Sequence, residues 1–322
     1  MRALVCEQLG PFDQLKVQDI AIPEPAKGQV RLKVAGCAMN FADTLVVQGL
    51  YQEKPQLPFV PGAEVSGVID AVGEGVAGKK VGDRVFAFTQ SGGYGEYLVT
   101  PAAMCIPIPD QVEDMAMMAA FPIAYGTAHT ALKHRGRMKD GERVLINGAG
   151  SGTGLAAVEV AKALGGTVIA LASTEEKRAK AQAKGADHVV DASAEDWVAQ
   201  VKALGGANLA YDVVGGEATR GLVSCLKPEG RLLVIGFASG KIPALPANLL
   251  LVKNISLVGS YFGGLSITNP MANALAIKEL VAWLVEGRVA PEGSEQLSLE
   301  QVPDGLARLA SRQVAGRLVV VP

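Results

Sequence analysis

Residues 143–164 read RVLINGAGSGTGLAAVEVAKAL and decide the fold. The first five are the short apolar run of a buried strand, and the last ten, LAAVEVAKAL, have the apolar spacing of a helix. The glycine-rich stretch Asn147–Gly154 lies between them. Such a turn lets backbone approach a pyrophosphate, and the helix N-terminus beyond it offers free N–H groups. In this strand–turn–helix context the segment predicts a dinucleotide-binding unit.

The alternation of strand and helix continues through the following hundred residues. A helix is expected at TEEKRAKAQAK (174–184), and further helical stretches separate the later strands. The expected strands are TVIALA (167–172), HVVD (188–191), NLAYDVV (208–214), RLLVIG (231–236) and, as a sixth, ISLVGSYF (255–262). Short apolar strands that alternate with helices predict βαβ units and a parallel sheet.

The first ~110 residues have a different texture, in which short apolar runs are separated by Gly, Pro and Asp, as in β-rich domains. Residues 110–135 then look helical, with Asp110 and Glu113 as a capping box and Pro122 as a break. From about Asn269 we expect a long helix, a shorter one and a final strand, GRLVVV, which return to the first domain.

Length and composition narrow the class of protein. The 322 residues are enough for two domains, and a hydrophobic share of 49% is ample for their cores. The net charge of −2 gives no indication of a nucleic-acid partner. No apolar run is long enough to cross a membrane, and the opening residues lack a secretory signal, so the expected location is the cytoplasm. The four scattered cysteines favour neither disulfides nor a Cys-rich metal site.

The end of the expected strand 167–172 indicates which dinucleotide is bound. A carboxylate at this point would hold the ribose 2′-hydroxyl of NAD. Here the strand runs into Ser173, and Lys177 and Arg178 follow shortly after. A small polar residue and two cations suit a 2′-phosphate, so NADPH is the expected cofactor. Ser173 with Glu176 also forms a capping-box pattern, which is the structural alternative.

An ordered set of motifs over essentially the whole chain resembles the medium-chain dehydrogenase/reductase superfamily, and within it the zinc-independent quinone oxidoreductases. In the first half these motifs are CAMNFADTLVVQGLY (37–51), LPFVPGAEVSGVIDAVGEGV (57–76), VGDRVFAF (81–88) and GGYGEYLV (92–99). In the second half they are FPIAYGTAHTAL (121–132), the glycine turn, GADHVVD (185–191), RLLVIGFASG (231–240) and AGRLVVV (315–321).

The resemblance implies an α/β fold: a Rossmann domain with a doubly wound parallel sheet, and a GroES-like β-barrel catalytic domain. We expect the catalytic domain at 1–118, completed by 269–322, and the NADPH-binding domain at 119–268. Zinc-dependent relatives carry a Gly-His-Glu segment, whereas this chain reads Gly62-Ala63-Glu64. The cysteine-rich lobe for structural zinc is also missing, so we expect no metal.

The resemblance also implies roles for individual residues. Catalytic roles fall to Asn40 and Asp43, which line the nicotinamide cleft between the domains. The chemistry itself, apart from the resemblance, makes Tyr51, Asn40 and backbone N–H groups of the cleft candidate donors to the developing oxyanion. Expected cofactor contacts are Asn40, Thr127, Gly150, Ser151, Gly152, Thr153, Gly154, Ser173, Lys177, Phe237, Phe262 and Arg317. Structural alternatives remain: Asn40 as a helix cap, Phe237 and Phe262 as core, and Arg317 as a surface charge.

Two departures from the family pattern concern the cofactor site. Ser151 and Thr153 stand where the usual turn, close to GAAGGVG, has Gly and Val. Asp191-Ala192-Ser193 occupies a region where the family often has a Tyr near the adenosine phosphate.

Three functions remain open at this point. The first is hydride transfer from NADPH to a quinone. The second is reduction of the double bond of an enone, an enal or an enoyl thioester, for which the same site chemistry would serve. The third is a non-catalytic role as an NADPH-binding structural or RNA-binding protein, against which the missing basic surplus counts.

The segment Asn254–Phe262 is apolar and has few charges to protect an exposed sheet edge. Two such edges can pair about a twofold axis, so we expect a homodimer. The structural alternative is that this segment is an interior strand.

Overall fold

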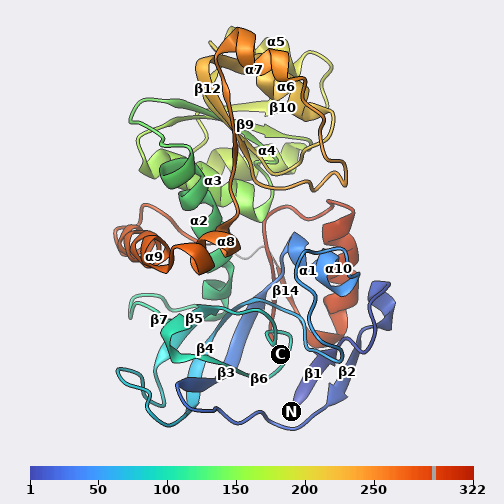
Figure 1. Ribbon diagram of the computed structural model, residues 1–322, viewed down its shortest axis with the longest axis vertical. Helices are drawn as coiled ribbons and strands as arrows, with labels where there is room; N and C mark the ends of the chain where they lie inside the picture. The colour runs from blue at the N-terminus through green and yellow to red at the C-terminus, as the bar shows by residue number, and fades with distance from the viewer. Residues whose placement is uncertain (292–294) are drawn as a thin grey trace. The chain divides into compact units, whose positions relative to one another are not determined.

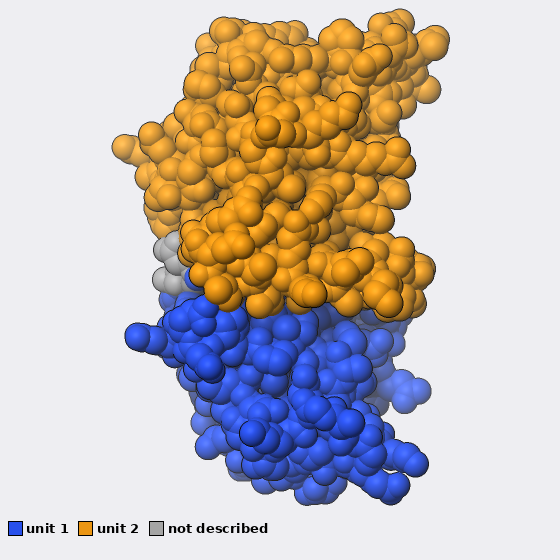
Figure 2. Space-filling view, turned by 90° about the vertical axis from the view of Figure 1, so that its left-hand side faces the viewer, with its two compact units in different colours: residues 1–122, 291–322 blue, residues 123–290 orange. Residues whose placement is uncertain are grey.

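The computed structural model describes residues 1–291 and 295–322. The chain forms two compact units, Met1–Pro122 with Pro291–Pro322 and Ile123–Ala290 (Figure 2). The first unit is therefore built from two separated parts of the chain, and the second from one continuous part. The sequence placed the return to the first unit at residue 269, whereas the compact units change at residues 290 and 291.

The second unit contains a six-stranded, fully parallel sheet (Figure 1). Its strand order is β10-β9-β8-β11-β12-β13, which is the 3-2-1-4-5-6 order of a doubly wound dinucleotide-binding fold. The strands are β8 (Arg143–Asn147), β9 (Thr167–Ala172), β10 (His188–Asp191), β11 (Ala207–Asp212), β12 (Leu226–Val234) and β13 (Ser256–Gly259). The parallel sheet that the sequence predicts is confirmed.

Helices connect these strands and bury their apolar faces on the sheet. Side chains of α5, α6 and α7 join those of the strands in one core cluster that includes Leu145, Ile169 and Leu222. The connecting helices are α3 (Gly152–Ala163), α4 (Glu175–Ala183), α5 (Trp197–Ala203), α6 (Ala218–Cys225) and α7 (Ala247–Lys253). α8 (Phe262–Thr268) and α9 (Pro270–Val285) follow the last strand.

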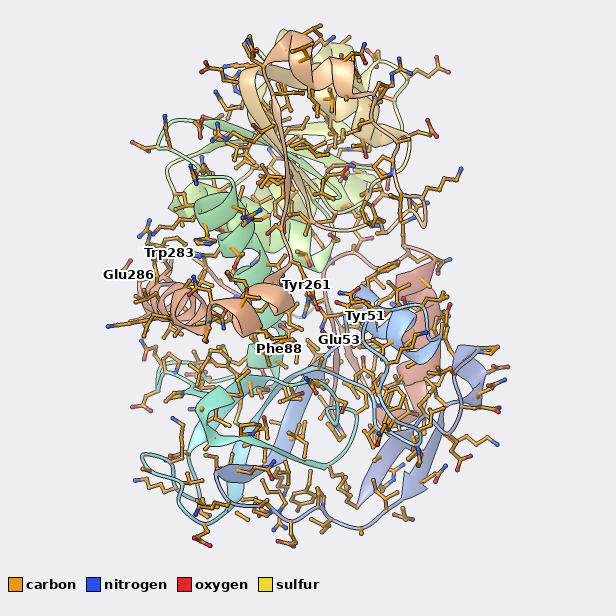
Figure 3. All side chains as sticks on the ribbon, in the orientation of Figure 1. Tyr51, Glu53, Phe88, Tyr261, Trp283 and Glu286 are labelled. Carbon is orange, nitrogen blue, oxygen red and sulfur yellow. The ribbon has the colours of Figure 1, made fainter. Side chains whose placement is uncertain are left out.

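The position of α9 accounts for the difference in the unit boundary. Glu279 on α9 contacts His129 with 2.8 Å between Oε2 and Nε2, and it also pairs with Lys133. Trp283 lies near the end of the same helix (Figure 3). The cations of Lys133 and Arg288 lie over its ring, 5.9 Å and 5.0 Å from the centroid. The helix is thus fixed to residues that precede β8, and it belongs to the second unit.

The first unit is built on a largely antiparallel sheet in the order β14-β15-β3-β4-β5-β7, with β6 also paired to β3. These strands are β3 (Gln29–Ala38), β4 (Glu64–Val72), β5 (Arg84–Phe88), β6 (Tyr97–Pro101), β7 (Cys105–Pro107), β14 (Glu295–Leu297) and β15 (Leu318–Val320). A two-stranded sheet of β1 (Arg2–Val5) and β2 (Lys16–Asp19) completes the unit with α1 (Phe41–Val47) and α10 (Val302–Ala310). Leu318 and Val320 lie in the same core as Val65 and Ile69, so the last strand is an integral part of the sheet.

Three local expectations differ from the structure. Asp110 does not begin a helix: the helical segments start with a short turn at Ala116–Ala120, and α2 (Pro122–His129) begins at the proline that was expected as a break. Thr174, not Ser173, caps α4, because its side chain accepts from the Lys177 N–H. The sixth strand ends at Gly259, and Phe262 begins α8.

Among the described residues, no helix is long and apolar enough to span a membrane.

Candidate functional site

The glycine-rich turn between β8 and α3 is fastened by one serine. Ser151 is the N-cap of α3, and its Oγ accepts the Gly154 N–H at 3.2 Å. The same hydroxyl donates to the carbonyl of Gly148 at 2.7 Å. Ser151, a departure from the usual turn, therefore replaces the missing glycine with a cap that holds the turn closed.

Two glycines of this turn have no room for a side chain. A Cβ on Gly154 would lie 2.2 Å from the carbonyl oxygen of Gly148. A Cβ on Gly150 would lie 2.4 Å from the Cβ of Lys177. These two close approaches keep the turn tightly folded at the N-terminus of α3, where Gly152 and Thr153 occupy the first helical positions. This arrangement fits the pyrophosphate of a dinucleotide.

The end of β9 lies against the same turn. Lys177, in the first turns of α4, packs its aliphatic stem on Gly150, as the close approach of the two residues shows. Ser173 is exposed between β9 and α4. Of the residues expected at the cofactor, the structure therefore brings Gly150–Gly154 and Lys177 together.

A buried pair that sequence reasoning missed fixes the loop after β11. The Oδ1 of Asp212 accepts from the Asn147 side chain at 2.9 Å and from the Val214 and Gly215 N–H groups at 3.0 Å each. Its Oδ2 accepts from the hydroxyl of Thr219 at 2.8 Å. The sequence feature that could have identified this pair is the aspartate at the end of the apolar strand NLAYDVV. Ligands of open α/β sheets bind at that carboxyl edge of the strands.

Thr127, Phe237 and Phe262 all lie in the second unit. A Cβ on Gly126 would lie 2.5 Å from the Phe262 ring, so this ring packs closely on α2, which carries the half-buried Thr127. Phe237 is half-buried after β12, and its Cδ1 would lie 2.9 Å from a Cβ on Gly215. Phe237 thus lies against the loop that Asp212 holds.

Asn40 and Asp43 form a buried pair in the first unit. Asn40 is the N-cap of α1, as the structural alternative proposed, and its N–H donates to Asp43 Oδ2 at 2.8 Å. The Tyr94 hydroxyl donates to the same oxygen at 2.8 Å. Burial raises the pKa of Asp43 from its ordinary value of 3.8 to about 6, against the lowering effect of the bonds from Asn40 and Tyr94. The negative charge of Glu64 raises this pKa further.

A buried ion pair holds the Asn40 side chain. Its Nδ2 donates to Glu64 Oε2 at 2.9 Å, and its Oδ1 accepts from Arg317 Nη1 at 3.0 Å. Arg317 Nη2 in turn pairs with Glu64. Both charged side chains are buried: the exposed fraction is 0% for Glu64 and 7% for Arg317. Arg317 is therefore not a surface charge, and it contacts Asn40 directly.

Tyr51 is half-buried in the loop after α1, close to Glu53 (Figure 3).

Within residues 1–291 and 295–322, no group of three or more His, Cys, Asp or Glu side chains has the arrangement of a metal site.

Comparisons with known proteins identify both halves of the chain. Residues 26–110 match the alcohol dehydrogenase GroES-like domain family, and residues 152–279 match the zinc-binding dehydrogenase family. The "Quinone oxidoreductase-like protein 2" of Bos taurus is 37% identical over 99% of this chain and 92% of its own length.

Solved structures agree with these matches. A mycobacterial protein complexed with NADPH superposes with a TM-score of 0.91 at 28% identity, and the superposition covers 100% of both chains. An NAD-dependent alcohol dehydrogenase gives a TM-score of 0.92 at 31% identity, again with 100% of both chains covered. The chain belongs to the medium-chain dehydrogenase/reductase superfamily, among its quinone oxidoreductase-like members.

Proposed function

We propose that the protein is an NADPH-dependent oxidoreductase that transfers hydride to a quinone-like acceptor without a metal. The observation that carries the proposal is the tight glycine-rich turn at Gly150–Gly154, at the N-terminus of α3, with the Lys177 stem packed against it. It joins a site suited to a pyrophosphate with a cation suited to a 2′-phosphate. The quinone oxidoreductase-like relatives and the NADPH-bound neighbour support the same function.

The residues present fit this cofactor. The Gly150–Gly154 backbone would hold the pyrophosphate, and Ser173 and Lys177 would hold the 2′-phosphate. Thr127 and the backbone at Phe237 and Phe262 would contact the nicotinamide end, as the family resemblance implies. The cofactor-binding domain in this proposal is the second unit, and the first unit supplies the catalytic residues Asn40, Asp43 and Tyr51.

Reduction of a quinone by NADPH requires that the protein orient the two reactants and supply one proton. NADPH supplies the hydride when it is bound, and a quinone that gains the hydride and a proton becomes a hydroquinone. The Asn40 amide is a fixed dipole, because Glu64 and Arg317 bond to its two ends. Arg317 acts in this proposal both near the cofactor and through Asn40. Tyr51 is the hydroxyl that would pass a proton to the reduced oxygen.

A panel of acceptors tests the proposal. NADPH oxidation is followed by absorbance with a quinone, with an enone or enoyl thioester, and with a simple ketone. We expect turnover with the quinone and higher kcat/KM for NADPH than for NADH. Turnover with the enone or thioester alone would assign double-bond reduction instead, and cofactor binding without any turnover would leave the non-catalytic role. Dialysis against a strong chelator should not change the rate, and stoichiometric zinc would contradict the metal-free mechanism.

A homodimer in the cytoplasm is the second part of the proposal. β13 is an edge strand of its sheet, and Leu257 on it is 46% exposed. Pairing of two β13 edges about a twofold axis would bury the Leu257 side chain. A charge at Val258 or Leu257 should convert a dimer to a monomer in light scattering. Val81→Lys changes a residue of the first unit that is 61% exposed and serves as the control. A wild-type monomer mass at micromolar concentration would contradict the proposal.

A further inference from the structure

An acidic residue lies beside the end of β9 although β9 itself ends without one. β10 runs parallel to β9, and Asp191 is the register partner of Ala172. Neighbouring strands lie about 4.8 Å apart, so Asp191 sits next to the strand end that leads into Ser173. The tertiary pairing thus brings a carboxylate to the place where the proposed cofactor site receives a 2′-phosphate.

This carboxylate is held on both of its oxygens. Oδ1 accepts from the Ser193 N–H at 2.8 Å and from its hydroxyl at 2.6 Å. Oδ2 pairs with Arg178 Nη1 at 3.0 Å. The hydrogen bonds from Ser193, and then the charge of Arg178, lower the pKa of Asp191, so the group is ionised at neutral pH.

Arg178 is anchored at the same strand end. Its Nη1 also donates to the carbonyl of Ala172, the last residue of β9, at 3.2 Å. Its side chain is 22% exposed, against 37% for Asp191. The guanidinium is therefore fixed between the end of β9 and the Asp191 carboxylate, one residue after Lys177.

We infer that Arg178 preserves the preference for NADPH over NADH as a positioning residue, because it neutralises Asp191, which would otherwise repel the 2′-phosphate. Without Arg178, a fixed negative charge would face a phosphate that itself carries about −1.5 to −2 charges. With Arg178 in place, the charge of Asp191 is compensated and no longer opposes the proposed contact between Lys177 and the phosphate. The inference rests on the proposed function, because it concerns the same cofactor.

The experiment measures dissociation constants rather than turnover. NADPH and NADH are titrated by nicotinamide fluorescence into the wild-type protein, Arg178→Gln, Asp191→Asn and the double variant. Adenosine 2′,5′-bisphosphate and 5′-AMP then serve as competitors that isolate the 2′-phosphate. Thermal melts check that each variant is folded.

We expect Arg178→Gln to lower the NADPH-to-NADH affinity ratio about fivefold, the scale of one partly exposed charge interaction. Asp191→Asn should raise the ratio, and the double variant should return to within about twofold of the wild type, because the pair acts as one neutral unit. High salt should shrink each change.

Three results would overturn the inference. An unchanged ratio in Arg178→Gln would remove the pair from specificity. If the affinity ratio of the double variant is as low as that of Arg178→Gln, Arg178 binds the phosphate directly. Glu175→Gln removes an exposed charge from α4, the helix that carries Arg178. If it raises the NADPH-to-NADH affinity ratio as much as Asp191→Asn does, the effect comes from the overall charge near the site and not from the pair. If the wild type binds neither nucleotide, the proposed function fails instead, and the two failures are thereby distinguished.

Discussion

Arg317 and Glu64, which are 253 residues apart in the chain, form an ion pair in which both side chains are buried. Asn40 bonds to both members and lies at the start of α1. The orientation of the Asn40 amide therefore depends on two residues that lie 24 and 277 positions away in the chain.

Removal of one member of this ion pair should be costly. Arg317→Met leaves the Glu64 carboxylate buried without its counter-charge, and we expect it to lower the free energy of unfolding by about 3 kcal/mol. Glu64→Gln with Arg317→Met should recover much of this loss. Urea denaturation of the single and double variants measures both, and equal loss in the two would argue that packing, not charge, is responsible.

Asp43 should make stability depend on pH. Its folded-state pKa of about 6 exceeds the ordinary 3.8, so the folded protein binds the proton more tightly than the unfolded chain. Stability therefore falls as pH rises between these two values, by up to about 3 kcal/mol, and the penalty is constant above them. Asp43→Asn keeps an oxygen that can accept from Asn40 and Tyr94 and should remove this slope. Denaturation at a series of pH values compares the two proteins, and parallel curves would contradict the assignment.

Lys177 should discriminate between the two cofactors by charge. Lys177→Met keeps an aliphatic stem against Gly150 and removes the ammonium, so it should weaken NADPH by about 1–2 kcal/mol and leave NADH nearly unchanged. Lys177→Ala should weaken NADPH as well and also loosen the turn. Fluorescence titration gives the constants. Equal losses for both nucleotides in Lys177→Met would mean that the charge does not meet the 2′-phosphate.

Gly154 should tolerate no side chain. In Gly154→Ala the new Cβ would lie 2.2 Å from a backbone oxygen, so the turn must open and nucleotide affinity should drop at least about tenfold. Gly259→Ala is the matched control, because a Cβ there meets nothing within 4 Å. Titration with NADPH and a thermal melt compare the two variants. Wild-type affinity in Gly154→Ala would exclude this turn as the pyrophosphate site.

The parallel sheet was predictable because its strands are short apolar runs bounded by glycine and polar residues, a pattern that depends only on local sequence. Capping was less predictable. Ser173 and Thr174 are both good caps by residue type, and only the helix geometry selects Thr174. Residues 110–115 have a capping pattern and helical composition but form no helix of their own, because a capping box alone does not supply tertiary packing.

The buried polar contacts were the least predictable part of the site. Asn40, Asp43 and Arg317 were named from the family resemblance, but the bonds of Asn40 and Arg317 to Glu64 join residues that only the folded sheet brings together. The same holds for Asp191, which reaches the end of β9 through strand pairing rather than through its position in the sequence.

The return of residues 295–320 to the first unit also orders events during synthesis. β15 pairs with β3, so Val320 meets Cys37 only after every residue of the second unit has been made. Until then β3 lacks this neighbour and Glu64 lacks Arg317. On the ribosome the second unit can therefore fold before the first is complete, an interval in which β3 has β4 and β6 as partners but Cys37 and Ala38 still lack their partner strand.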